Sequence, residues 1–127
     1  MFAESIAHNL KFAAPHAERD ELENVISKLE LTDWIRSLPD GLETQVGQRG
    51  ASLSAGERQL VALARAALTN PDILILDEAT SAVDAIAEVR LAKALQALSL
   101  GRTTISSAHR LSTAARADRV IVLEHGL

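Results

Sequence analysis

Ile73-Leu74-Ile75-Leu76-Asp77-Glu78 is the stretch of sequence that decides the fold of this chain. Its four apolar residues predict a strand that is buried on both faces of a parallel sheet. Two acids follow at the carboxyl end of the strand, and open α/β sheets bind ligands at that edge. Because successive residues of an extended chain point in different directions, one carboxylate can hold a metal ion while the next faces a water molecule. Taken alone, the pattern more often means only a strand that ends in a solvated acidic turn.

Helices and strands are predicted to alternate on the C-terminal side of Pro71. Helical periodicity covers residues 84–98, and apolar and hydroxyl side chains predict a strand over residues 103–107. A short helix over residues 111–117 and an apolar strand over residues 120–123 are expected to follow. This alternation predicts right-handed crossovers and a parallel sheet, and therefore the α/β fold class.

The chain before Pro71 is predicted to be mainly helical. Asp20 and Glu23 have the spacing of a capping box, and apolar residues follow them at helical intervals. The other elements expected here are helices over residues 5–12, 34–38 and 54–68, and a loop over residues 44–51 that holds Gly47 and Gly50.

Composition limits the classes of function. Hydrophobic residues make up 47% of the chain, enough for a core, whereas aromatic residues make up 2%, too few for a base-stacking nucleic-acid surface. The 13 basic and 17 acidic residues give a net charge of −4, and no basic run predicts a nucleic-acid partner. Cysteine is absent, which excludes disulfides and thiolate metal sites. No apolar run has membrane-spanning length and the first residues lack a secretory-signal pattern, so any link to a membrane is expected through a partner.

The segment Leu53-Ser54-Ala55-Gly56-Glu57 combines a helix start with features of a phosphate site. Ser54 and Glu57 have capping-box spacing, so the plain interpretation is a well-capped helix. The N-terminus of a helix also offers free N–H groups and the positive end of the helix dipole to a phosphate. Gly56 would let a ligand approach the backbone closely.

Two further places have weak signals of their own. His109 follows the strand predicted over residues 103–107, and a lone histidine at a strand end is usually structural. Ser81-Ala82-Val83-Asp84 is a short turn in which Asp84 can cap the next helix.

Taken together, in this order and at this spacing, the motifs resemble those of ABC ATPases. Residues 53–59 are similar to the signature motif of that family, and residues 73–78 are similar to its Walker B motif. Residues 81–84 resemble the D-loop, and His109 resembles the switch histidine. The resemblance implies part of a P-loop NTPase (RecA-like) parallel sheet joined to an α-helical subdomain.

The resemblance is closest to exporter-type domains. Residues 2–10 resemble the start of their helical subdomain, and residues 38–50 resemble their X-loop region. ABC ATPases of DNA repair are not known for this loop. The implied organisation is a helical subdomain with the X-loop and signature helix over residues 1–70, and the C-terminal part of the ATPase core over residues 71–127.

In the family, two ATPase domains sandwich two ATP molecules head to tail and drive a transmembrane domain. The resemblance therefore implies ATP and Mg²⁺ as ligands, and a second ATPase domain and a transmembrane domain as partners, at the cytoplasmic face of a membrane. Ser54, Ala55, Gly56 and Glu57 would contact the γ-phosphate of ATP bound to the partner. In the same comparison Asp77 would hold Mg²⁺, Glu78 would be the general base, His109 would contact the γ-phosphate, and Ser81 and Asp84 would form the D-loop at the dimer interface.

Four residues depart from the family pattern. The signature carries Ala55 where glycine is usual and Glu57 where glutamine is usual. A carboxylate near ATP would weaken binding unless the helix cap occupies it. Gln45 and Gln48 stand where the X-loop usually has glutamates, which removes negative charge from a proposed coupling contact.

The sequence contains no G-x-x-x-x-G-K-[ST] pattern, the loop that gathers the phosphates in this family. We therefore expect a C-terminal fragment, cut at both ends relative to a complete domain, that neither hydrolyses ATP nor binds it tightly by itself. In related folds the P-loop strand lies between the strands predicted over residues 103–107 and 120–123. We expect the fragment to fill that place by collapse, by pairing with another copy or by disorder.

Two other interpretations stay open at this point. The chain is a non-catalytic interaction module in one of them, with the signature helix as a docking surface. In the other it belongs to a soluble ABC ATPase of DNA repair or translation, against which the X-loop-like stretch and the acidic balance argue.

Overall fold

Five helices and two short strands make up the regular structure of the residues that the computed structural model describes, which are 1–77, 84–107, 114–115 and 117–122. The helices are α1 (Ile6–Lys11), α2 (Arg19–Lys28), α3 (Thr32–Ser37), α4 (Ala55–Leu68) and α5 (Ala85–Ser99), and the strands are β1 (Ile73–Leu76) and β2 (Thr103–Ser106). Two 3₁₀ turns, η1 (Gly41–Glu43) and η2 (Gln48–Gly50), lie between α3 and α4.

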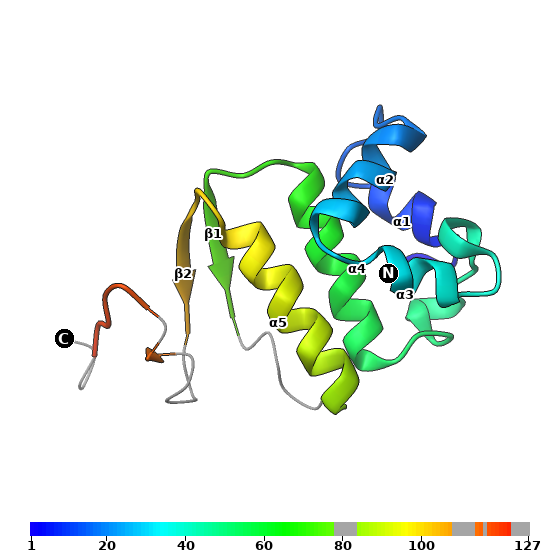
Figure 1. Ribbon diagram of the computed structural model, residues 1–127. Coiled ribbons are helices and arrows are strands. Elements are labelled where there is room, and N and C mark those ends of the chain that lie inside the picture. The colour runs from blue at the N-terminus through cyan, green and yellow to red at the C-terminus, as the bar shows by residue number, and fades with distance from the viewer. Residues whose placement is uncertain (78–83, 108–113, 116, 123–127) are drawn as a thin grey trace.

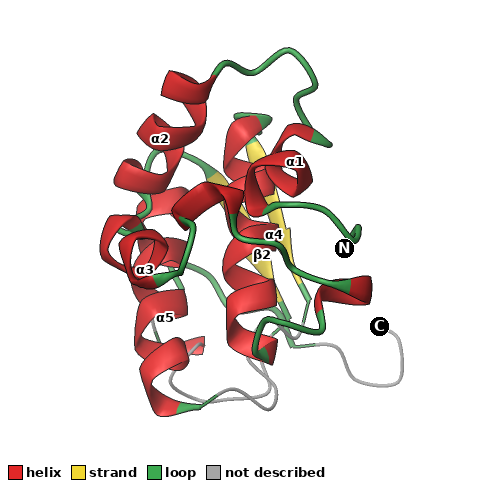
Figure 2. Ribbon diagram, turned by 90° about the vertical axis from the view of Figure 1, so that its right-hand side faces the viewer, coloured by secondary structure: helices red, strands yellow, loops and turns green. Residues whose placement is uncertain are grey.

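The helices lie on one side of the two-stranded sheet (Figure 1). The helices α4 and α5 pack against each other, and α4 also contacts α1 and α2. Turned by 90°, Figure 2 shows the strands behind α4, with α1 and α3 on the side that faces the viewer. The helix α4 is thus the central element, between the sheet side and the N-terminal helices.

The sheet is parallel, as the alternation of elements predicted. Ile73 pairs with Thr103 and Leu76 pairs with Ser106, with no bulge between them. Arg102 fixes the start of both strands, because its Nε donates to Pro71 O at 2.9 Å and its Nη2 donates to Asn70 Oδ1 at 2.8 Å. The α/β fold class expected from the sequence is confirmed.

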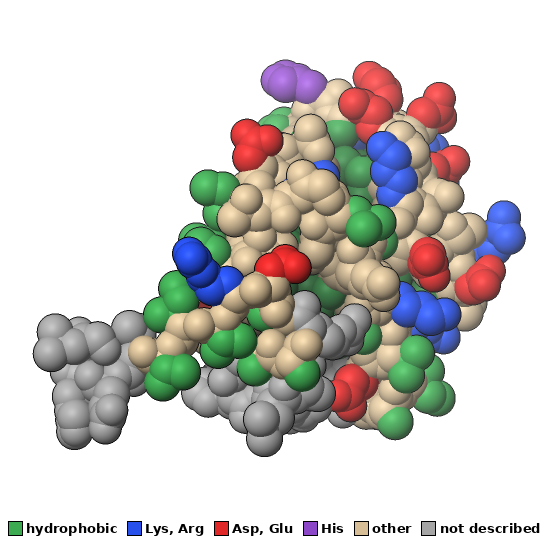
Figure 3. Space-filling view, turned by 60° about the vertical axis from the view of Figure 1, so that its left-hand side comes forward, with side chains coloured by type: hydrophobic (Ala, Val, Ile, Leu, Met, Phe, Trp, Pro, Cys, Tyr) green, Lys and Arg blue, Asp and Glu red, His purple; other side chains and the backbone are tan. Residues whose placement is uncertain are grey.

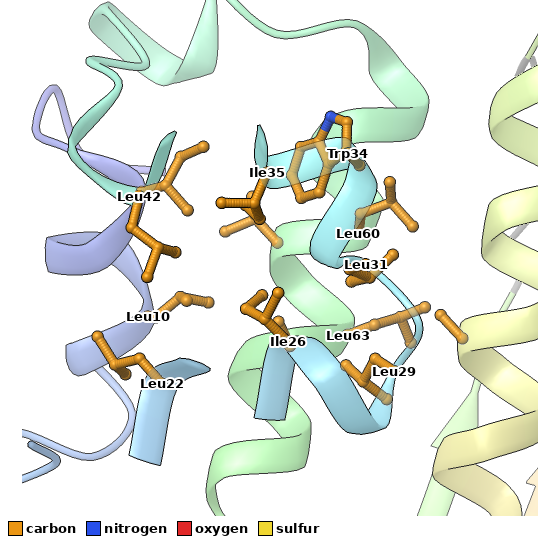
Figure 4. Packing of buried hydrophobic residues seen from close by; sticks show 14 of the residues in the cluster. Leu10, Leu22, Ile26, Leu29, Leu31, Trp34, Ile35, Leu42, Leu60 and Leu63 are labelled. Carbon is orange, nitrogen blue, oxygen red and sulfur yellow. The ribbon is translucent and has the colours of Figure 1, made fainter. Parts of the chain in front are cut away.

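One hydrophobic cluster holds the described elements together. Trp34 is 2% exposed, and Leu31 and Leu60 lie beside it in the cluster (Figure 4). The cluster continues through Leu74 of β1 and Leu91 of α5, so the helical part and the sheet part share it. Burying such side chains stabilises the fold by about 1.5–3 kcal/mol each.

The prediction that β1 is buried on both faces is wrong. Leu74 is 6% exposed and belongs to the core, whereas Ile73 and Ile75 are 58% and 74% exposed. Among the described elements, helices cover only the face that carries Leu74. Ile75 pairs with Ile105, which is 57% exposed, so the apolar side chains of the other face lie next to each other. Figure 3 brings the β2 side of the molecule forward and shows hydrophobic side chains at this surface.

Two local predictions also need correction. The capping box of α2 consists of Glu18 and Glu21, not Asp20 and Glu23, because Glu18 is the last extended residue before the helix. Residues 120–122 form no strand and are exposed, so the apolar run there does not pair with β2 in the described part of the chain. Most of the helix expected over residues 111–117 lies outside the described residues. The last residue of the strand expected over residues 120–123 also lies outside them.

No described helix is both long enough and apolar enough to cross a membrane.

Candidate functional site

The N-terminal tip of α4 is a capping box, as the sequence predicted. Ser54 is extended, and its Oγ accepts a hydrogen bond from Glu57 N at 3.2 Å. In return, Glu57 Oε2 accepts from Ser54 N at 2.8 Å. Ser54 is exposed at the start of the helix and is not buried within it. Its hydroxyl accepts one bond here and keeps its own proton to donate to a ligand.

The backbone of the same tip offers further donors. The amide groups of Ala55 and Gly56 have no hydrogen-bond acceptor among the described residues, as is usual in the first turn of a helix. Ala55 is half-buried and Gly56 is buried. The helix of 14 residues adds the positive end of its dipole at this position. These features suit an anion.

The loop before the tip is fixed by contacts that the sequence did not reveal. Arg58 Nη1 donates to Leu53 O at 2.6 Å and to Gly50 O at 3.4 Å. Gly50 has φ +78, and a Cβ at this position would lie 2.7 Å from Met1 Sδ and 3.0 Å from Arg58 Cδ. Only glycine fits such a backbone without a shift of its neighbours. The loop therefore delivers Leu53 and Ser54 to the helix in a defined conformation.

Glu57 has both carboxylate oxygens occupied. Besides the bond from Ser54 N to Oε2, its Oε1 accepts from Trp34 Nε1 at 3.0 Å. Burial by itself raises the pKa of Glu57, but the backbone bond from Ser54, the Trp34 bond, a side-chain contribution of Ser54 and the charge of Arg90 lower it more. The pKa therefore lies below its ordinary value, and the carboxylate is charged at neutral pH.

Asp77 lies directly after β1, at the carboxyl end of the parallel sheet, as predicted. It is exposed, and its Oδ1 accepts a hydrogen bond from Ser107 Oγ at 2.9 Å. Ser107 reaches this place because its N–H donates to Leu76 O at 3.0 Å and extends the pairing by one residue. Sequence reasoning missed Ser107, although parallel pairing of the two predicted strands would have placed their ends together.

Asp84 caps α5, as expected from its place in the turn. Its Oδ1 accepts from Ile86 N at 3.1 Å and from Ala87 N at 3.0 Å. The N-terminal ends of α4 and α5 and the carboxyl end of β1 lie toward the same end of the molecule (Figures 1 and 2). Ser54, Asp77 and Asp84 therefore gather at that end. Glu78, Ser81 and His109 lie outside the described residues.

A metal site made by this chain alone is not evident. Within residues 1–77, 84–107, 114–115 and 117–122, no group of three or more histidines or acids is arranged to hold an ion. Asp77 nevertheless suits Mg²⁺, because this ion commonly takes only one or two carboxylates and fills its other positions with water and phosphate oxygens.

Comparison with known proteins shows to which family the chain is similar. The family model described as ABC transporter matches residues 2–81, more than half of the chain. The ATP-dependent lipid A-core flippase of Ralstonia nicotianae is 48% identical, over 99% of this chain and 22% of the flippase. The ABC multidrug transporter mdr2 of Aspergillus fumigatus is 52% identical, over 97% of this chain and 16% of the transporter.

A solved structure is similar as well. A bacterial Atm1-family ABC exporter with ATP bound superposes with a TM-score of 0.84 at 42% identity, over 99% of this chain and 22% of the exporter chain. The chain thus spans about a fifth of the length of the relatives that it matches.

Proposed function

Because this chain belongs to the ABC transporter family, we propose that it forms the signature and Walker B part of an ATP-hydrolysing domain that powers export across a membrane. One observation carries the proposal: the exposed, capped tip at Ser54 and the sheet-edge carboxylate of Asp77 lie toward the same end of one fold. Residues 1–70 would be the helical subdomain with the X-loop and signature helix, and residues 71–127 the C-terminal part of the ATPase core.

The tip of α4 would act on ATP that is bound to a second ATPase domain. The Ser54 hydroxyl would donate to a γ-phosphate oxygen, and the N–H groups of Ala55 and Gly56 would contribute two more donors. Glu57 lies in the first turn of the same helix, and its carboxylate accepts from Ser54 N. Donors that are already in place cost little reorganisation when phosphate charge develops, which is how catalysis of phosphoryl transfer mainly works.

The end of the sheet would act on ATP that is bound in the same domain. Asp77 would hold Mg²⁺, which supplies positive charge beside the phosphate oxygens when it is bound. Ser107 would keep one carboxylate oxygen of Asp77 in place through the 2.9 Å hydrogen bond. Glu78 would be the general base that takes a proton from the attacking water. His109 would contact the γ-phosphate, and Ser81 and Asp84 would lie at the interface with the second domain.

The partners in this proposal are a second ATPase domain in a head-to-tail dimer and a transmembrane domain. A longer subunit would provide the phosphate-binding loop, because the sequence of this chain contains none. The site would then lie at the cytoplasmic face of the membrane. Nucleic acid is not expected as a partner.

The 127-residue chain by itself should neither hydrolyse ATP nor bind it tightly, since a helix tip alone replaces neither the loop nor its lysine. Isothermal titration of the purified chain with Mg-ATP should give no heat of binding at micromolar concentrations. Micromolar affinity would contradict this part of the proposal.

Glu78→Gln tests the enzymatic role in the longer subunit. We expect ATP turnover to be lost, while the subunit still assembles. A non-catalytic interaction module predicts unchanged assembly and no dependence of any activity on residue 78. Unchanged turnover would therefore favour the docking alternative.

A further inference from the structure

Glu57 poses an electrostatic problem at a site for ATP. A carboxylate in the first turn of α4 suits the helix dipole, yet it would repel an approaching triphosphate if its oxygens pointed outward. The structure shows where they point. Oε2 faces Ser54 N at 2.8 Å, and Oε1 faces Trp34 Nε1 at 3.0 Å. Both oxygens are therefore directed at donors of the protein itself.

Trp34 is a rigid partner for this carboxylate. Its ring is 2% exposed in the core beside Leu60 and Leu31, and its nitrogen lies on the side of the ring away from both leucines (Figure 4). A buried indole N–H needs an acceptor, and Glu57 provides it. The side chain of Glu57 is thus held between the hydrophobic core and the backbone of Ser54.

We propose that Glu57 is a positioning residue, which uses its contact with Trp34 to hold Ser54 and the first turn of α4 in the orientation that meets phosphate. This inference rests on the proposed role of the tip in binding ATP on a second domain. Trp34 belongs to α3 and Ser54 precedes α4, so Glu57 joins two elements at the point where the tip is exposed.

The two donors explain why this position holds a glutamate. Each donor meets a different oxygen, and a carboxylate accepts on both. A glutamine has one carbonyl oxygen and one NH₂ group, so one of the two N–H donors would face another donor. In a Trp34→Phe variant, only Ser54 N would need an acceptor, and the glutamine carbonyl would suffice. The effect of Glu57→Gln should therefore depend on residue 34.

The first test uses the 127-residue chain itself. Trp34 is the only tryptophan, so its indole N–H gives a single ¹⁵N–¹H signal. Glu57→Gln should move either this signal or the backbone amide signal of Ser54, because the single glutamine carbonyl can accept from only one of the two donors. Glu21→Gln is the matched control, because Glu21 Oε2 accepts only from Glu18 N in the capping box of α2 and a glutamine carbonyl can replace it. Unchanged signals of both the Trp34 indole and the Ser54 amide in Glu57→Gln would overturn the proposal.

The second test measures ATP turnover of the longer subunit. Loss of one charge-assisted hydrogen bond should lower kcat about tenfold in Glu57→Gln with little change of KM. In a Trp34→Phe background the same substitution should change kcat by less than about threefold, because the glutamine then satisfies the remaining donor. Glu21→Gln should leave kcat as it is.

The remaining outcomes separate this inference from the proposed function. Ser54→Ala should lower kcat in every background if the tip contacts ATP, and no effect of Ser54→Ala would refute the role of the tip. If Ser54→Ala lowers kcat but Glu57→Gln does not, the tip binds ATP and Glu57 only stabilises the fold. If Glu57→Gln lowers kcat equally in the wild-type and the Trp34→Phe backgrounds, Glu57 acts on the phosphate directly. Both of the last results overturn the positioning role.

Discussion

Single side chains define where the long helices begin. Ser54 caps α4 and Asp84 caps α5, each from an extended residue just before the helix. Both were predicted from the sequence, because a capping residue acts on N–H groups two or three positions away and needs no distant partner. At the start of α5 one oxygen serves two donors, Ile86 N and Ala87 N.

Asp84→Ala should lower the free energy of unfolding by about 1 kcal/mol, because two N–H groups of the first turn lose their acceptor. Urea denaturation followed by circular dichroism measures the change. Asp84→Asn is the control and should lose less than half as much, since the amide oxygen still accepts. Equal losses in the two variants would show that the charge, and not the cap, stabilises α5.

Glu57 should make stability depend on pH in the acidic range. Its folded-state pKa lies below the ordinary glutamate value of about 4.3, so the charged form stabilises the fold above that value. This contribution is lost as pH falls through the lower folded-state pKa. The groups facing Glu57 are Ser54, Trp34 and Arg90, and neither serine nor tryptophan titrates there.

The measurement is the difference in free energy of unfolding between the wild type and Glu57→Gln. We expect the wild type to be more stable at pH 7, and the difference to shrink as pH is lowered below about 4.3. Protonation of the other acids affects both proteins and cancels. A difference that stays constant down to pH 3 would contradict a charged, hydrogen-bonded Glu57.

Contacts between distant residues are the part of the site that the sequence did not predict. The bond from Trp34 to Glu57 joins residues 23 positions apart, and that from Ser107 to Asp77 joins residues 30 positions apart. Residue type and spacing do not encode which side chains face each other across elements. The local capping box at Ser54 and the sheet-edge place of Asp77 needed only periodicity and strand order.

At the scale of elements, α4 is the helix against which most of the other helices pack. It contacts α1, α2 and α5, and its buried face includes Leu60, Val61 and Ala64. Leu60 and Ala64 are among the residues whose helical spacing predicted this helix from the sequence. The exposed side of β1 was not predictable in the same way, because a run of four apolar residues has no alternation to show which face is covered.

Leu60→Ala should destabilise the chain by about 3 kcal/mol, because Leu60 is 0% exposed and its removal leaves a cavity between helices. The same substitution at Leu68, half-buried in the last turn of α4, should cost about 1 kcal/mol. Urea denaturation of both variants tests this. Similar losses at both positions would mean that the centre of the cluster relaxes around the missing side chain.

At the scale of the molecule, one face of the sheet is apolar and exposed. Ile73, Ile75 and Ile105 lie together on it, at 57–74% exposure. Exposed apolar side chains beside an unpaired strand edge favour association. The sequence predicted that β1 is buried on both faces, so the exposure of Ile73 and Ile75 is a correction of that prediction.

The purified chain should therefore self-associate as its concentration rises, and Ile75→Lys should weaken this association without loss of the fold. Sedimentation velocity over a range of concentrations measures it. Val89→Lys is the control, since Val89 is 58% exposed on α5 and lies outside the sheet. A wild-type chain that sediments as a monomer at every concentration would contradict the prediction, as would equal effects of the two lysines.

The guanidinium of Arg102 has a consequence for the opposite end of the sheet. It ties the segment before β1 to Arg102, the residue just before β2, and the strands run from there in parallel without a bulge. Sliding one strand along the other by a residue would break these bonds together. Arg102 therefore helps to fix the register of the two strands, and this register places Ser107 beside Asp77 at their carboxyl ends.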